Sequence, residues 1–166
     1  MSTENLSREE AWKKLRDLVD DIKIAMMITG FDKAPVHAVP MRTKKVDKQG
    51  NIWFLSLRNS THDLDLIKNK SVQLLYSDPS DMEFLSVYGD AEVTSDKEII
   101  EELYSKMTDN WFDGPDDPNI TAIRVRPEEA YYWDTKMNKY VSLFKLGFGA
   151  MTGKKQDPGE KGKLNL

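Results

Sequence analysis

The spacing of apolar residues changes along the chain, and each change marks a predicted element. Near the N-terminus, apolar residues recur every three or four positions, which is typical of one face of an amphipathic helix. The residues in this repeat are Ala11, Leu15, Leu18, Val19 and Ile22. Ser7 and Glu10 have the spacing of a capping box, in which each side chain satisfies a free backbone amide at a helix start. A helix is therefore predicted over about residues 8 to 21.

Compact or alternating apolar runs bounded by turn residues predict the strands. These runs cover residues 24–29, 36–41, 52–57, 72–76, 84–93, 121–125 and 129–133. Gly89 interrupts the longest run and indicates a bulge or bend, because glycine weakens a regular strand. The polar segments 30–35 and 45–51 are predicted to be a turn and a hairpin loop.

Two short helices are predicted between these strands. Ser60 is placed to cap a helix that carries Leu64, Leu66 and Ile67, and serine is a favoured residue at that position. Ser95 and Glu98 have the spacing of a second capping box, ahead of apolar residues at helical spacing up to Met107.

Seven short strands with only a few helices between them predict an α+β fold that is mainly β, a six- to seven-stranded antiparallel barrel. A doubly wound parallel sheet is disfavoured because the strands do not alternate strictly with helices. Residues 1–150 are predicted to form one domain with an N-terminal helix. Residues 151–166 are predicted to be a polar tail, mobile or draped over the surface.

Composition narrows the functional class. The chain has 166 residues, 39% hydrophobic and 31% charged, with a net charge of -4 and no cysteine. The acidic balance argues against nucleic acid as the main partner, and the lack of cysteine excludes disulfides and thiolate metal sites. No apolar run approaches the ~20 residues that span a bilayer, and the charged N-terminus lacks an apolar signal core. The expected location is the cytoplasm, and no membrane partner is expected.

No catalytic template is visible in the sequence. The two histidines, His37 and His62, do not have metal-binding spacing, so no metal site is predicted. No serine lies in a G-x-S-x-G context, and no glycine-rich phosphate loop is present. Asp116 and Asp117 precede Pro118 and are interpreted as turn formers. No residue is assigned as a catalytic acid or base.

One segment does suggest an anion site. Basic residues follow the second predicted strand, and the next strand is followed by Arg58, Ser60, Thr61 and His62. If the two strands form a hairpin, these polar ends approach the start of the helix capped by Ser60, where backbone amides and the helix dipole favour an anion. The alternative is a solvated basic turn with a serine cap.

The stretch WFDGPDDPNITAIRVRPEEAYYWD, residues 111 to 134, carries large aromatic residues at both ends. Such residues belong in a core, an interface or a ligand site. Trp111 and Phe112 precede a turn with two prolines and a glycine, which can hold them over a neighbouring surface. The sequence leaves core, interface and ligand-cleft positions open for Trp111, Phe112 and Trp133.

Taken together, the chain resembles the flavin-binding split barrels related to pyridoxamine 5'-phosphate oxidase, in their general-stress-protein branch. The segments that carry the resemblance are H-A-V-P-M (37 to 41), G-N-I-W-F-L-S (50 to 56), N-S-T-H (59 to 62), V-Y-G-D-A-E-V (87 to 93), W-F-D-G-P-D-D-P (111 to 118) and Y-Y-W-D (131 to 134). The resemblance runs from about Ala11 to Trp133. It implies a six-stranded split barrel that forms a homodimer, with FMN or FAD in each of two clefts between subunits.

The resemblance also implies a set of cofactor-binding residues. The phosphate would bind at Val39, on the strand after His37, and at Ser60, Thr61 and His62. The flavin ring would lie along Met41 and Arg42 and along the strand that contains Phe54, Leu55 and Ser56. Trp111 or Trp133 of the other subunit would close the cleft.

Two positions depart from the family pattern. Val39 stands where the family often has arginine, and His62 stands where it often has lysine or arginine. These changes weaken the expected phosphate clamp, because charge-assisted hydrogen bonds are roughly twice as strong as neutral ones. Arg42, Lys44 or Arg58 could compensate. The basic C-terminal substrate motif of true pyridoxamine phosphate oxidases is absent, so that reaction is not expected.

The resulting expectation is a stress-related, flavin-dependent oxidoreductase acting on a small molecule, with a reduced nicotinamide as a possible electron donor. Two alternatives stay open. One is a flavin-binding or flavin-sensing stress protein without turnover, and the other is a barrel that has lost the cofactor.

Overall fold

A computed structural model describes residues 2–3, 8–135, 159–164 and 166. The helices are α1 (Arg8–Ile22), α2 (Thr61–Lys68) and α3 (Lys97–Leu103), followed by a short 3-10 helix, η1 (Lys106–Asn110). The strands are β1 (Ser2–Thr3), β2 (Ile24–Thr29), β3 (His37–Val46), β4 (Ile52–Leu57), β5 (Ser71–Asp78), β6 (Glu83–Thr94), β7 (Ile120–Thr135) and β8 (Gly159–Leu164). In this described part, no helix is both long and apolar enough to cross a membrane.

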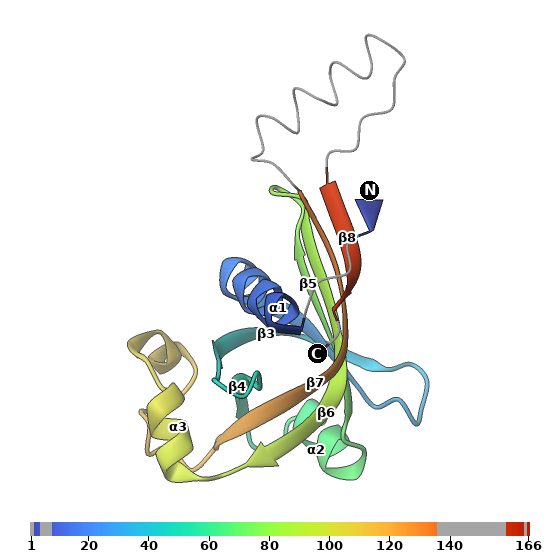
Figure 1. Cartoon of the computed structure of the whole chain (residues 1–166). Helices are drawn as coiled ribbons and strands as arrows, with labels where there is room; N and C mark the ends of the chain where they lie inside the picture. Colours follow the sequence, from blue (N-terminus) through green and yellow to red (C-terminus); the bar gives the residue numbers. More distant parts are fainter. Residues whose placement is uncertain (1, 4–7, 136–158, 165) are drawn as a thin grey trace.

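The strands form one sheet that closes on itself. Its order is β1-β8-β7-β4-β3-β2-β5-β6, and β6 also pairs with β7. The closed part is therefore a six-stranded antiparallel barrel, which confirms the split-barrel prediction. Figure 1 shows the long strands β6 and β7 curving from the end beside α2 and α3 toward β8.

The barrel core follows from the alternation of side chains along the strands. In β2, Ala25, Met27 and Thr29 are fully buried, whereas Ile24 and Met26 are exposed. The apolar face of α1 joins the same core through Ala11, Leu15, Leu18 and Val19. The helical period predicted for this segment is thus confirmed, and Ser7 of its predicted cap lies outside the described residues.

The two last predicted strands are one continuous strand, β7. Its first part pairs with β4, its last part pairs with β8, and β6 runs along most of its length. Pro127 lies in the middle but is accommodated by a register shift beside Gly89, which confirms the predicted bulge. A Cβ atom on Gly89 would lie 2.1 Å from the carbonyl oxygen of Arg126, so the close approach of the two strands requires glycine.

A second, smaller cluster lies on the outer side of the barrel. Ile100 and Leu103 of α3 pack there against Trp53 of β4 and against Ile120 and Ala122 of β7. This contact fixes α3 next to β4. It therefore sets where the chain that leaves α3, with η1 and Trp111, can lie.

The cap predicted for α3 also differs from the structure. The residue that caps α3 is Asp96, whose carboxylate accepts hydrogen bonds from the amides of Glu98 and Ile99, at 3.0 and 3.2 Å. Ser95 instead accepts a hydrogen bond from Arg58 at 3.1 Å. Of the predicted tail, residues 151–158 and 165 lie outside the described residues, and residues 159–164 form β8, which pairs with β7 because two segments distant in sequence satisfy each other's backbone groups.

Candidate functional site

A groove of about 450 Å³ opens between the β3–β4 hairpin, the start of α2 and the segment around η1. Its volume lies within the range of about 300–1,000 Å³ that is usual for small-molecule sites. The lining residues are mostly apolar: Ile24, Pro40, Met41, Arg42, Lys44, Leu55, Ser56, Leu57, His62, Met107, Thr108, Trp111 and Phe112. A larger hollow of about 840 Å³ beside α1 is lined mainly by charged side chains of α1 and by Lys48 and Gln49, so the groove is the better candidate.

Six of the residues predicted from the sequence line this groove. They are Met41, Arg42, Leu55, Ser56, His62 and Trp111. Ser60 lies next to it, because its hydroxyl is 3.1 Å from His62 Nε2 and 3.3 Å from Ser56 Oγ. Thr61 is exposed at the first position of α2. Arg42 and Lys44, expected to follow a strand that ends at Met41, instead lie within β3, and they line the groove together with His62 of α2.

Three predicted residues are not brought to the groove of their own chain. Phe54 is fully buried in the barrel core, because it shares the inward face of β4 with Ile52. Val39 is half-buried and packs against that same core. Trp133 lies near the end of β7 that pairs with β8, where its ring is 6.5 Å from that of Tyr131.

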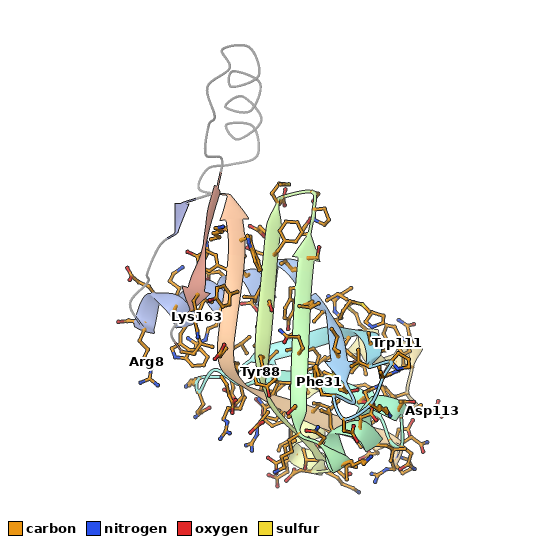
Figure 2. All side chains as sticks on the ribbon, turned by 90° about the vertical axis from the view of Figure 1, so that its right-hand side faces the viewer. Arg8, Phe31, Tyr88, Trp111, Asp113 and Lys163 are labelled. Carbon is orange, nitrogen blue, oxygen red and sulfur yellow. The ribbon has the colours of Figure 1, made fainter. Side chains whose placement is uncertain are left out.

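Trp111 follows η1 and is 69% exposed, which places it outside the barrel core. Figure 2 shows it on the side of the molecule opposite Lys163, a residue of β8. Phe112 is half-buried, lines the groove and packs against the cluster under α3. One wall of the groove is thus an aromatic side chain that its own chain leaves largely uncovered.

Two of the three basic residues considered as phosphate ligands border the groove. Arg42 is exposed and has no ion-pair partner among the residues that the structure describes. Lys44 donates to the hydroxyls of Ser105 and Thr108, at 3.2 and 3.0 Å. Burial and the neighbouring charge of Arg42 lower the pKa of Lys44, and a bound anion would counteract that effect.

Arg58 is engaged elsewhere. Its Nε donates to the carbonyl of Pro118 at 2.8 Å and its Nη2 donates to Ser95. These bonds tie the chain after β4 to the turn before β7. Arg58 therefore anchors the fold and does not take the place of the missing clamp residues in this conformation.

The start of α2 carries a buried polar network that the sequence analysis missed. Asp63 is 1% exposed, and its carboxylate accepts hydrogen bonds from Ser56 Oγ at 2.7 Å and from Thr121 Oγ1 at 2.6 Å. Ser56 Oγ lies 2.7 Å from His62 Nε2. Because Thr121 is far from this segment in sequence, only the pairing of β4 with β7 brings it here.

The electrostatics of this helix start are mixed. The Ser60 hydroxyl accepts a long hydrogen bond from the amide of Asp63, 3.4 Å, and forms the predicted cap. The Asp63 carboxylate already places a negative charge in the first turn, where an external anion would also bind. Burial lowers the pKa of His62, the charge of His37 lowers it further, and the charges of Asp63 and Asp65 oppose both effects.

His62 also stacks on His37. Their ring centroids are 5.9 Å apart and their planes differ by 2°. Further along α2, Asp65 accepts hydrogen bonds from Thr29 Oγ1 and Lys33 Nζ, at 3.0 and 2.8 Å, which holds the loop after β2 against the helix. The network fixes His62 from several elements at once.

Comparison with known proteins agrees with this architecture. Residues 10–157 match the family model described as pyridoxamine 5'-phosphate oxidase like. General stress protein 26 of Bacillus subtilis (strain 168) is 25% identical over 144 residues, which cover 83% of this chain and 99% of that protein.

Solved structures share the fold. A candidate general stress protein 26 from Jannaschia sp. CCS1 has a TM-score of 0.74 and 24% identity, and the match covers 95% of this chain and 97% of that one. A general stress FMN/FAD binding protein from Xanthomonas citri has a TM-score of 0.67 and 20% identity, with 78% and 92% covered.

Proposed function

The chain belongs to the pyridoxamine 5'-phosphate oxidase-like family, and on that premise we propose that it binds a flavin, FMN or FAD, in the groove between the β3–β4 hairpin and the η1 segment. The observation that carries this proposal is the lining of the groove. Apolar and aromatic side chains form its walls, and the polar groups gather at the α2 start and at Arg42 and Lys44. A flavin has the same division between an aromatic ring and polar substituents.

Different residues of this chain would then contact different parts of the flavin. Met41 and Leu55 would pack along the flavin ring, and Trp111 would cover it and exclude water. Arg42, Lys44 and the first turn of α2 would face the polar and charged groups of the cofactor. When bound, the flavin itself would supply two-electron redox chemistry.

We propose that the activity is a flavin-dependent oxidation or reduction of a small molecule, with a reduced nicotinamide as the electron donor. The similarity of this chain to general stress protein 26 of Bacillus subtilis supports a role linked to stress. No described side chain in the groove is assigned as an acid or base, so the protein would contribute binding, orientation and exclusion of water.

We also propose that the working form is a homodimer. The exposed outer faces of β2, β3 and β5 carry Met26 beside Pro40 and Leu75, since Met26 pairs with both in the sheet. With Ile24 and Leu57 at the groove edge, this makes a continuous apolar surface of the kind that marks interaction sites. A partner subunit would cover the surface and complete the groove, and Trp133 would reach a flavin only from that partner.

A specific observation supports a second candidate, a barrel that has lost its cofactor. Arg58 is engaged in structural hydrogen bonds, and Asp63 already occupies the first turn of α2. Together with valine and histidine at the two clamp positions, these features weaken the binding of a phosphate. A flavin-binding protein without turnover is the intermediate case.

Titration separates these functions. Apo protein is titrated with FMN and with FAD while flavin fluorescence is recorded, and saturable quenching at one flavin per chain is expected. Arg42→Ala is expected to weaken binding about tenfold, whereas Arg126→Ala, an exposed arginine that does not line the groove, should leave it unchanged. Absence of saturation up to millimolar flavin would instead establish the cofactor-free barrel.

Turnover is tested on the reconstituted protein. Oxidation of reduced nicotinamide, followed by absorbance, should be faster than with the same concentration of free flavin. A bound flavin with no rate above that background would identify the non-catalytic binding protein.

A further inference from the structure

The proton positions around His62 can be deduced from its partners. Asp63 is buried, and both of its carboxylate oxygens accept hydroxyl hydrogen bonds. A carboxylate only accepts, so the single hydroxyl proton of Ser56 is directed to Asp63. The Ser56 oxygen therefore has only lone pairs to offer His62, and at 2.7 Å from Nε2 it requires a proton on that nitrogen.

Ser60 supports the same assignment. Its oxygen accepts from the amide of Asp63 and lies 3.1 Å from His62 Nε2, so the Nε2–H group points between two serine oxygens. Neutral imidazole carries one proton, and the second ring nitrogen is then an acceptor. In neutral His62, Nδ1 consequently bears a free lone pair.

His62 Nδ1 is open to a ligand. No described residue hydrogen-bonds to it, and the atom is not completely buried. His62 lines the groove, although it is only 8% exposed. The stack on His37 holds one face of the imidazole, and Ser56 and Ser60 hold its Nε2.

Resting on the proposed flavin site, we infer that neutral His62 recognises its ligand as a hydrogen-bond acceptor through Nδ1, with Ser56, Asp63 and Thr121 as the positioning residues. The preferred ligand group carries an O–H or N–H donor, such as a ribityl hydroxyl or the imide N–H of a flavin ring. The lysine or arginine that the family often has at this position can only donate. At this position this chain would therefore bind a hydrogen-bond donor of the ligand, whereas lysine or arginine would bind an acceptor.

Protonation reverses this selectivity. Protonated His62 donates through Nδ1–H and attracts an anion, so lower pH favours a phosphate at the α2 start. The charged or titratable groups around the ring are Asp63 and Asp65 of α2, His37 of β3 and Lys33, which is paired with Asp65. The acceptor state of His62 is the neutral-pH state, because burial opposes protonation.

The tautomer is measured directly. Protein labelled with 15N in its two histidines gives long-range 1H–15N correlations that distinguish Nε2–H from Nδ1–H, and His37→Gln assigns the signals. At pH 8 we expect His62 as the Nε2–H form in the apo protein. A predominant Nδ1–H form would overturn the inference without affecting the flavin proposal.

Two serine variants test the positioning network. Ser56→Ala removes the oxygen that fixes the proton on Nε2, so the Nε2–H fraction of His62 should fall. Ser77→Ala, at an exposed position of β5, should leave the tautomer unchanged. An unchanged tautomer in folded Ser56→Ala protein would remove Ser56 and Asp63 from the positioning role.

Flavin analogues then identify the donor group. Riboflavin compared with lumiflavin tests the hydroxyls, and lumiflavin compared with 3-methyllumiflavin tests the ring N–H. One of these comparisons should show about a fivefold preference at pH 8 that is lost in His62→Ala. If His62→Ala changes neither preference, the acceptor role is wrong; if no flavin binds at all, the function proposed for the groove fails instead.

The pH arm uses the ratio of FMN to riboflavin affinity. In the wild type this ratio should rise about tenfold as His62 becomes protonated, which requires a pH below the ordinary histidine pKa of 6.5 because burial lowers the pKa of His62. The phosphate of FMN also titrates near pH 6, so His62→Lys serves as the control because lysine stays charged throughout. A ratio with the same pH profile in both proteins would contradict the reversal.

Discussion

At the scale of single residues, two positions show how a local contact sets stability or binding. Gly89 of β6 lies against the backbone of β7, and any Cβ atom there would collide with the carbonyl of Arg126. Trp111 has the opposite character, since most of its surface is exposed and its few contacts border the groove.

Gly89→Ala is predicted to destabilise the protein by about 1–3 kcal/mol, because the added methyl group must push apart two paired strands. Thermal melting should show the loss as a decrease of several degrees in Tm. Ser77→Ala on the neighbouring strand β5 is the control and should change Tm little. A wild-type Tm in Gly89→Ala would mean that the bulge relaxes without cost.

Trp111→Ala is predicted to weaken flavin binding about three- to tenfold, through the loss of aromatic stacking. Its effect on stability should stay within about 0.5 kcal/mol, because exposed substitutions rarely do more. Trp12→Ala provides the contrast, since Trp12 packs partly buried against the core and over Gly50. The Trp12→Ala variant should lose stability and keep its flavin affinity. If Trp111→Ala instead lost stability and kept its flavin affinity, Trp111 would lie outside the binding site.

At the scale of elements, the β3–β4 hairpin that forms one side of the groove depends on Asp47. Its carboxylate accepts from the amides of Gln49 and Asn51, both at 2.9 Å, and from Trp53 Nε1 at 2.8 Å. Burial alone would raise the pKa of Asp47, but these hydrogen bonds outweigh it and lower the pKa below its ordinary value of 3.8.

Asp47→Ala is predicted to cost about 2–3 kcal/mol at neutral pH, because the buried indole N–H loses its acceptor. A lowered native pKa means that the charged form stabilises the fold above the ordinary pKa and that this contribution is lost as pH falls through the native value. The difference between Asp47→Ala and the wild type in chemical denaturation should therefore shrink below about pH 4. A difference independent of pH would remove the carboxylate from this role.

Glu83, the first residue of β6, opposes folding at high pH. Burial and the nearby charges of Asp134, Asp21, Asp81 and Asp78 raise the pKa of Glu83 to about 7. A raised native pKa means that stability is full below the unfolded value and is lost as pH rises through the native value. The ionised form of Glu83 is thus unfavourable at pH 8.

Glu83→Gln is predicted to raise Tm at pH 8 by a few degrees, on the order of 1 kcal/mol after allowing for solvent screening of a partly exposed group. At pH 5 the gain should nearly vanish, because native Glu83 is then protonated. Glu101→Gln on α3 is the matched control and should behave alike at both pH values. Equal gains for Glu83→Gln at pH 5 and pH 8 would exclude charge repulsion as the cause.

At the scale of the whole molecule, the proposed homodimer explains why Met26, Pro40 and Leu75 form an exposed apolar surface across β2, β3 and β5. A stable interface of this type should bury about 2,000 Å² or more in total. The surface around Met26 is central, since its strand neighbours Pro40 and Leu75 lie on either side.

Sedimentation is predicted to show a dimer at micromolar concentration for the wild type. Met26→Lys should shift the protein toward monomer and weaken flavin binding at the same time, because a charge would be buried without a partner. Met82→Lys, at an exposed site in the β5–β6 turn, should stay dimeric. A monomeric wild type would leave the groove open and would contradict the shared-cleft proposal.

The sequence by itself determined the features that depend on near neighbours in the chain. The helical repeat of α1, the strand pattern of β2 and β4, the Ser60 cap and the Gly89 bulge each follow from local spacing or backbone chemistry. Six of the residues that the family motifs indicated line the groove, because Met41 and Arg42 of β3 lie beside Leu55 and Ser56 of the paired strand β4 and near the start of α2.

Tertiary structure decided the features that depend on which distant segments meet. The pairing of β4 with β7 brings Thr121 to Asp63, and the turn before β7 draws Arg58 away from the helix start. The same pairing left Phe54 facing the core while its neighbour Leu55 faces the groove. Which hydrogen bonds form and which side chains are buried depends on the strand pairings that close the barrel, and the local sequence does not specify those pairings.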